Sequence, residues 1–228
     1  MFKIIYTLIA LATHTTLVTH TALISTNDST ENVLIYKKTN IDFSFIIRPN
    51  SVRSKKIEDG TFNNSKHDRG NYVNGRFVGT NRSVSAPTLQ RWRGYPINAD
   101  HMKNLTKNEA IQIYKKIYVD HNLHKMEVYN PILVDIIFNA ICSSSGVARF
   151  KTVCKKMGIS VSDGANMKIA DVESFNSWNN SYEKEMKFYK LFWELSKSFY
   201  EKRSKGKLSG LKKWIQNYDY FIYEIKNF

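Results

Sequence analysis

The sequence predicts a mainly helical fold with one small β-hairpin. From residue 105 onward, apolar side chains recur at helical spacing in several segments that turn-forming residues separate. Residues 61–98 lack this periodicity and are rich in asparagine and glycine. Within them, Tyr72 to Val78 is typical of a hairpin, because its Asn74-Gly75 pair suits the two-residue turns that join antiparallel strands. A run of helices with a small β element belongs to the mainly α class.

Charge and composition limit the classes of partner. The 228 residues include 34 lysines and arginines against 20 acidic residues, which gives a net charge of +14. This excess favours an anionic partner such as nucleic acid, an acidic membrane or an anionic cell-wall polymer. The basic residues are spread along many segments, so we expect no nucleic-acid binding. After the N-terminus no stretch is apolar enough for a stable membrane span. We also expect the protein to be a monomer.

The N-terminal residues 1–25 resemble a secretory signal peptide. Lys3 precedes an apolar run from Ile4 to Ala12, and small residues follow near Ala22. This pattern predicts a secreted or cell-envelope protein. The alternative is an ordinary buried N-terminal element.

Residues 26–50 are predicted to form a linker with short strands. Val33–Tyr36 and Ile41–Phe45 have the β-branched and alternating character of strands. Pro49 then marks a break. We expect a short helix over residues 52–58 that ends at Gly60, because glycine often follows the last turn of a helix.

The clearest helix start lies at Thr106. Thr106 and Glu109 have the spacing of a capping box, in which the threonine oxygen accepts from a first-turn amide and the glutamate reaches back. Asn180 and Glu183 repeat this spacing. One face of the first helix is expected to carry Ala110, Ile113, Tyr114, Ile117 and His121. Further helices are expected over residues 130–141, 147–157, 169–175, 180–200 and 211–225.

No cofactor or metal site is predicted. Cys142 and Cys154 lack a metal-ligand spacing, and we interpret them as buried thiols, with a disulfide as the alternative. His121 and His124 lie three residues apart, but no acidic or cysteine set completes a zinc site. The sequence also lacks a glycine-rich phosphate loop of P-loop or Rossmann form.

Several segments together resemble glycoside hydrolase family 108, the muramidase-like secretion-activator proteins. These proteins carry a Glu-Gly-Gly-Tyr turn, an Asp-x-Gly-Gly segment, a Thr-Asn-x-Gly-Ile-Thr segment and a helix of the form Leu-Thr-x-x-Glu-Ala-x-x-Ile-Tyr. The corresponding segments here are Ile57–Phe62, Asp68–Asn71, Thr80–Ser85 and Leu105–Tyr114. The resemblance extends over roughly residues 51–220, through Pro131–Asn139 and the Asp163-Gly164 turn.

The resemblance implies a lysozyme-like fold and a domain order. Residues 51–141 would form the catalytic part, and residues 142–228 a helical, C-terminal peptidoglycan-binding part. The implied activity is that of an N-acetylmuramidase, which cleaves the β-1,4 glycosidic bond of peptidoglycan. The implied partner is peptidoglycan or another anionic cell-wall polymer.

Glycoside cleavage needs a carboxylic acid to protonate the leaving oxygen and a second group to activate water or stabilise the sugar cation. By resemblance Glu58 is the acid; without the resemblance it would be interpreted as a solvated surface glutamate. Asp68 is the first choice for the second group and Asp59 a weaker one, while the Ser85 hydroxyl is placed to orient a water. Asp68 as a plain turn residue is the alternative. The predicted substrate-binding residues are Tyr72, Thr80, Asn81, Trp92 and Tyr95, with burial in the core as the alternative for the aromatic ones.

Two departures from the family pattern motivate a second hypothesis. The Glu-Gly-Gly-Tyr turn reads Glu58-Asp59-Gly60-Thr61, and Gly-Ile-Thr reads Ser83-Val84-Ser85. A catalytically impaired relative that binds peptidoglycan without cutting it would tolerate both changes. The third hypothesis is a basic helical protein that binds nucleic acid.

Overall fold

The computed structural model describes residues 23–24, 34–35, 38–49, 51–143 and 145–204. By its contacts the chain divides into two compact units, residues 1–36 and 37–228. In the first unit, β1 (Leu23–Ile24) pairs antiparallel with β2 (Leu34–Ile35). The rest of the predicted signal peptide, the polar part of the linker and the predicted helix over 211–225 lie outside the described residues.

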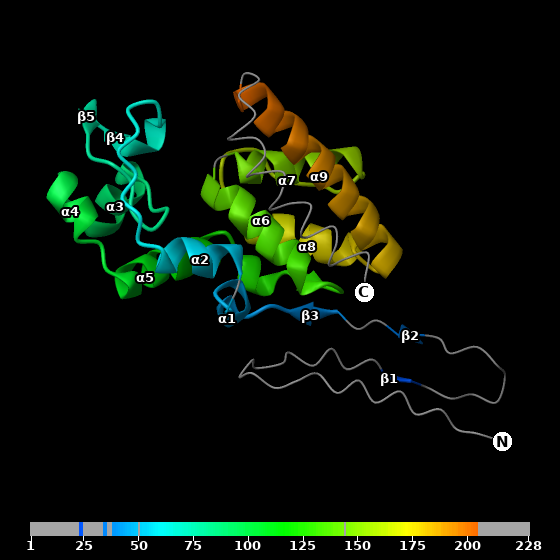
Figure 1. Cartoon of the computed structure of the whole chain (residues 1–228). Helices are drawn as coiled ribbons and strands as arrows, with labels where there is room; N and C mark the ends of the chain where they lie inside the picture. Colours follow the sequence, from blue (N-terminus) through cyan, green and yellow to red (C-terminus); the bar gives the residue numbers. More distant parts are fainter. Residues whose placement is uncertain (1–22, 25–33, 36–37, 50, 144, 205–228) are drawn as a thin grey trace. The chain divides into compact units, whose positions relative to one another are not determined.

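The second unit is mainly helical (Figure 1). Its elements, in chain order, are β3 (Thr39–Asn40), α1 (Phe43–Ile46), α2 (Val52–Glu58), the short 3-10 helix η1 (Arg69–Asn71), β4 (Tyr72–Val73), β5 (Arg76–Phe77), α3 (Ala86–Arg93), α4 (Ala99–Lys103), α5 (Lys107–Asp120), the 3-10 helix η2 (Leu123–Lys125), β6 (Glu127–Val128), α6 (Pro131–Ser143), α7 (Gly146–Lys156), α8 (Ile169–Trp178) and α9 (Tyr182–Ser204). This confirms the predicted class, mainly α with a small hairpin.

Helix α6 forms the centre of the core. Every residue from Pro131 to Ala140 is buried, and all but Asp135 and Asn139 are apolar, as expected of a helix in the centre of a core. It packs against α1, α7 and β6. The Phe138 ring meets the rings of Phe43, Tyr114 and Tyr118 at centroid distances of 6.2, 6.2 and 5.7 Å. Two neighbouring elements, α1 and α5, therefore meet at one aromatic side chain of α6.

Helix α2 is fixed to this core by a buried cation. Arg53 is 1% exposed, and its guanidinium lies 4.4 Å from the ring centre of Tyr114 and 5.4 Å from that of Phe138. It donates a hydrogen bond of 2.8 Å to Oδ1 of Asn139. Ile57, one turn later, is also buried. Among the side chains of residues 53–58, the buried face of α2 therefore consists of a cation and one apolar side chain.

The hairpin is confirmed. Strands β4 and β5 pair antiparallel with Tyr72 opposite Phe77 and Val73 opposite Arg76. Asn74 and Gly75 both have positive φ values, +49° and +74°, as a type I′ turn requires.

The capping box at Thr106 is only half formed. The threonine side chain accepts from the amide of Glu109 at 3.1 Å, as predicted. The Glu109 carboxylate does not reach back to the cap. It accepts two hydrogen bonds of 2.8 Å from the guanidinium of Arg93, which lowers the pKa of Glu109. The prediction failed here because a bidentate pair with arginine is stronger than a bond to a solvated amide. This pair ties α3 to α5.

Two further local predictions are wrong. Ile41–Phe45 was expected to be a strand, but the chain forms the single helical turn α1. Phe43 and Ile46 are both buried, and their three-residue spacing suits one face of a helical turn. At α9 the cap is Ser181, whose hydroxyl accepts from Lys184 at 3.3 Å, one residue after the expected Asn180.

Buried carboxylates fasten the last helices. Glu185 of α9 accepts from the amides of Tyr129 and Asn130 at 2.8 and 2.7 Å, so it caps the start of α6. Asp171 of α8 pairs with Lys151 of α7 at 3.2 Å.

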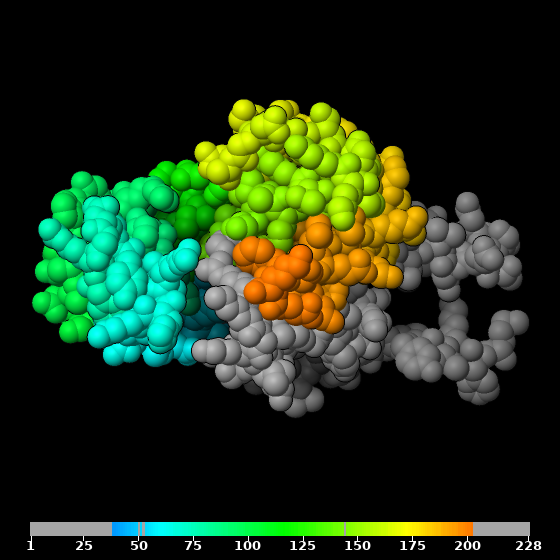
Figure 2. Space-filling view, turned by 90° about the horizontal axis from the view of Figure 1, so that it is seen from above, coloured from blue at the N-terminus to red at the C-terminus, as the bar shows by residue number. Residues whose placement is uncertain are grey.

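Figure 2 shows one face of the molecule, with the hairpin and α3 to α5, in cyan and green, at one side and α7 to α9, in yellow-green to orange, at the other. Cys142 and Cys154 are free thiols. Cys154 is buried as predicted, whereas Cys142, which was also expected to be buried, is only half-buried.

The buried carboxylate of Asp135 makes stability depend on pH. Burial raises the pKa of Asp135 to about 6, although Arg48 lies 3.1 Å away and opposes the shift. The folded protein therefore holds this proton more tightly than the unfolded chain. The resulting stabilisation is present below about pH 4 and is lost as the pH rises through about 6.

We compare the parent with an Asp135→Asn variant by the difference between their free energies of unfolding (parent minus variant). We expect this difference to decrease by on the order of 2 kcal/mol between pH 4 and pH 7. Urea denaturation of both proteins across this range measures the difference. A difference that does not change with pH would contradict the assignment to Asp135.

Candidate active site

Glu58 ends α2 with its side chain half exposed. Its carboxylate forms an ion pair with the ammonium group of Lys107, the first residue of α5, and the two side chains are 52% and 49% exposed. A ligand in solution can therefore reach both groups. The structure places a carboxylate where α2 meets the start of α5.

Arg82 connects this position to the loop that follows. Its guanidinium donates to the backbone oxygen of Ile57, lies 3.4 Å from that of Glu58, and donates to that of Leu105 at 3.1 Å. The carbonyl of Arg82 in turn accepts from the buried Tyr114 hydroxyl at 3.0 Å. The last carbonyls of a helix lack partners within it, so a cation placed there stabilises the helix end.

Gly60 makes room for this guanidinium. Its φ is +54°, and a Cβ at this position would lie 3.0 to 3.2 Å from the guanidinium atoms of Arg82. Glycine adopts the left-handed conformation and permits the close approach without strain, whereas a larger residue would strain the backbone and push the guanidinium away. The Arg82 guanidinium therefore packs closely against the Glu58-Asp59-Gly60 turn.

The two ends of the loop from Asn63 to Thr80 are paired. Asn63 donates to Thr80 at 2.7 Å and accepts from it at 3.1 Å. Beside this bridge, the Phe62 ring packs so closely on Gly79 that a Cβ there would lie 2.4 Å from a ring carbon. The polar loop is therefore fixed at its base, directly after the Glu58 turn.

Three of the predicted site residues gather around Gly70. A Cβ built on Gly70 would lie 3.2 Å from Oδ1 of Asp68, 3.5 Å from Cβ of Ser85 and 3.8 Å from Oγ1 of Thr80. The Asp68 carboxylate accepts from the Gly70 amide at 2.9 Å and from the Asn63 side chain at 3.0 Å. Asp68 is therefore the turn residue that the alternative interpretation expected, with its carboxylate half-buried beside two hydroxyl-bearing residues.

The remaining predicted residues take different places. Asn81 is buried, and its amide donates to the carbonyls of Met102 and Lys103 at 3.0 and 3.1 Å, so it supports the loop. The Tyr72 hydroxyl donates to the Lys66 carbonyl. Trp92 and Tyr95 are exposed by 39% and 47%, so their rings are not core residues.

A shallow hollow of about 400 Å³ lies between the hairpin and α3. Its lining includes Asn74, Gln90, Arg91 and Tyr95. It offers an aromatic ring beside amide and guanidinium groups, which are the groups that sugars commonly contact.

Sequence reasoning missed Lys107 and Arg82. Lys107 carries a weak signal, because a lysine in the first turn is unfavourable beside the positive end of the helix dipole and so suggests an anionic neighbour. Arg82 occupies a variable position of the family motif and carries no local signal. Only the fold brings it to the end of α2.

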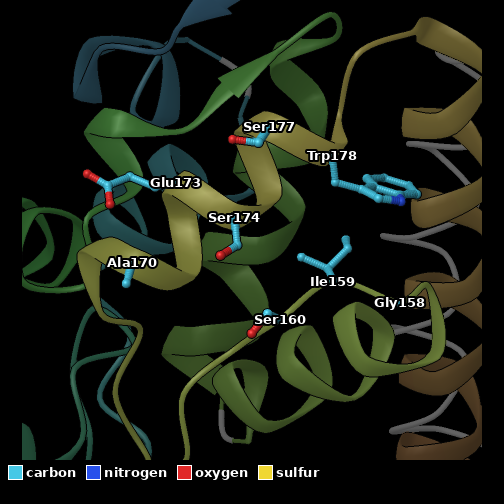
Figure 3. A pocket seen from close by; sticks show the side chains of 8 residues that line it. All are labelled: Gly158, Ile159, Ser160, Ala170, Glu173, Ser174, Ser177 and Trp178. Atoms are coloured by element: carbon cyan, nitrogen blue, oxygen red, sulfur yellow. The ribbon is translucent and has the colours of Figure 1, made fainter.

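A second hollow, of about 580 Å³, lies between the end of α7 and α8 (Figure 3). Ser160 and Ser174 line it, with Ile159 and Trp178 on one side. The sequence analysis singled out none of these residues.

The comparison with protein families supports one of the sequence-based resemblances. Residues 56–140 match the Glycosyl hydrolase 108 family. No curated protein and no solved structure matches the chain at the significance we required. The match contains Glu58, the loop and α3 to α5, and it supports a glycoside hydrolase with a fold in agreement with the lysozyme-like class. It does not extend over the predicted C-terminal peptidoglycan-binding part.

None of the described helices is long and apolar enough to cross a membrane. Across the same part of the chain, no group of three or more His, Cys, Asp or Glu side chains is arranged to hold a metal ion.

Ser83 stands where the Thr-Asn-x-Gly-Ile-Thr segment has a glycine, and its backbone conformation is one that favours glycine. Ser83 has a φ of +57°, in the left-handed region that costs a non-glycine residue about 1 kcal/mol. We expect Ser83→Gly to raise the free energy of unfolding by about 1 kcal/mol. Ser177→Gly, at an exposed position near the end of α8 with an ordinary helical backbone, is the control and should not raise it. Chemical denaturation measures both, and a loss of stability in Ser83→Gly would contradict the strained conformation.

Proposed function

We propose that this protein is an N-acetylmuramidase that cleaves the β-1,4 glycosidic bond of peptidoglycan, with Glu58 as the general acid. One observation carries the proposal: a half-exposed carboxylate stands on a fixed helix end inside the segment that matches a glycosyl hydrolase family. Resemblance to the family's glutamate turn assigns the acid to this residue.

The chemistry requires Glu58 to deliver a proton. Protonated Glu58 gives its proton to the glycosidic oxygen as the bond from that oxygen to the sugar carbon breaks. Water then adds to the sugar carbon and loses a proton to a carboxylate. A sugar must enter beside Glu58 and displace the Lys107 ammonium, which an exposed ion pair permits because such pairs contribute little stability.

Asp68 is the proposed second group. Hydrogen bonds from Gly70 and Asn63 fix its carboxylate, and each oxygen keeps a lone pair for a water or for the developing charge of the sugar. Ser85 lies beside it across Gly70. Its hydroxyl, 2.8 Å from that of Thr88, would orient the attacking water.

The substrate would extend over the exposed rings. Tyr95 and Trp92 offer aromatic faces to the sugar CH groups, with Tyr72 and Thr80 closer to Asp68 along the loop. The net charge of +14 would hold the protein, as a monomer outside the cytoplasmic membrane, on an anionic wall. The helical part over residues 142–228 is the proposed wall-binding part, with Trp178 and the serines of the second hollow as its contact with the glycan.

A second candidate is a relative that binds peptidoglycan without cutting it. Both carboxylates of the proposed pair are occupied in the free protein, Glu58 by Lys107 and Asp68 by Gly70 and Asn63. Position 83 also carries a strained serine. Binding to the wall would survive both features.

Removing the acid separates these candidates. We expect Glu58→Gln to lower the rate of peptidoglycan hydrolysis at least 100-fold, the usual loss when a general acid is removed, and to leave co-sedimentation with the wall unchanged. Asp120→Asn, at the exposed last residue of α5, removes the same charge outside the proposed wall-binding part and should keep full activity. Release of soluble fragments from purified peptidoglycan measures the rate.

Equal hydrolysis by the parent and Glu58→Gln would exclude Glu58 as the acid. Sedimentation with the wall and no hydrolysis by the parent would favour the binding-only candidate.

A further inference from the structure

We propose that Arg82 is the positioning residue of the site: it fixes the end of α2 and thereby the origin of the Glu58 side chain. This inference rests on the proposed role of Glu58. Arg82 bonds to backbone oxygens from two distant segments, those of Ile57 and Glu58 at the end of α2 and that of Leu105 just before α5. One side chain thus joins the two helix ends that carry Glu58 and Lys107.

Helix α2 needs such a clamp because it is short. It has seven residues, so most of its carbonyls belong to the unpaired last turn. Within that turn the amide of Asp59 donates to the carbonyl of Lys55 at 3.0 Å. A cation on the carbonyls of Ile57 and Glu58 completes the turn and opposes the negative end of the helix dipole.

The other contacts of Glu58 fix its position less strongly than Arg82 does. Its ion pair with Lys107 is about half exposed on both sides, and exposed pairs of this kind impose little order. Buried Ile57 holds one side of the last turn but does not direct the next residue. Arg82 acts on the backbone of Glu58 itself.

Arg82 is itself held in an unusual backbone. Arg82 and Ser83 have successive positive φ values of +49° and +57°, which turn the chain and direct the guanidinium back toward α2. The Tyr114 hydroxyl donates to the Arg82 carbonyl, and burial raises the pKa of Tyr114 to about 12, so this donor keeps its proton. Strain of this kind persists where the surrounding structure determines it and is frequent at functional sites.

The test compares Arg82→Met and Arg82→Lys in the full chain. We expect Arg82→Met to lower kcat 10- to 100-fold on soluble peptidoglycan fragments, with KM changed less than twofold. Arg82→Lys should recover part of kcat, because an ammonium reaches one carbonyl but does not span three. Arg76→Met, at an exposed position of β5, is the matched control and should keep kcat. A purely structural role predicts a lower melting temperature with normal kcat in the folded protein, which would overturn the proposal.

Gly60 provides an independent route to the same defect. A Cβ at Gly60 would press on the Arg82 guanidinium, so Gly60→Ala should also lower kcat at nearly constant KM. In the double variant with Arg82→Met the two losses should not multiply, because both remove one contact. Losses that multiply would show that Gly60 acts without Arg82.

Amide hydrogen exchange distinguishes failure of this inference from failure of the proposed function. Arg82→Met should speed exchange of the Asp59 amide at least tenfold and leave the centre of α5 unchanged. If the parent hydrolyses nothing, the muramidase proposal fails, and the exchange result alone decides the positioning role. Unchanged exchange at Asp59 would overturn it whatever the activity.

Discussion

A buried guanidinium determines where the site lies. Arg53 is enclosed between the rings of Tyr114 and Phe138 and bonds to Asn139 of α6. Asn139 donates in turn to Asp135 at 2.7 Å. A buried charge is costly unless its partners are fixed, so this cluster tolerates few arrangements of α2 against α5 and α6. The end of α2, and with it Glu58, follows from this packing.

Three cations contribute to the position of the proposed acid, Glu58, and each fixes a different part of the chain that carries it. Arg53 holds the helix, Arg82 holds the last turn of the helix, and Lys107 holds the carboxylate itself. Of these contacts, only the one with Lys107 involves the Glu58 carboxylate, and it is half exposed on both sides, so a substrate can replace it. The site is therefore rigid in its backbone and open at the one group that must exchange a proton.

The sequence predicted what depends on neighbours in the chain. Helical periodicity predicted α5 to α8, the Asn74-Gly75 pair predicted the hairpin, and Thr106 predicted the start of α5. Each of these signals depends only on residues that are close together in the chain. Arg53 could not be predicted, since a cation in a short helix normally indicates a solvated face. Arg82 and the partner of Glu109 depend on residues 16 to 25 positions away in the chain. Asp68 was recognised, but only the fold showed that it gathers with Thr80 and Ser85.

The products of the reaction show which bond of peptidoglycan the protein cleaves. Purified peptidoglycan would be incubated with the full chain, the new reducing ends reduced with borohydride, and the fragments identified by mass spectrometry. We expect fragments that end in reduced N-acetylmuramic acid. Fragments that end in reduced N-acetylglucosamine, or cleavage within the peptides alone, would contradict this expectation.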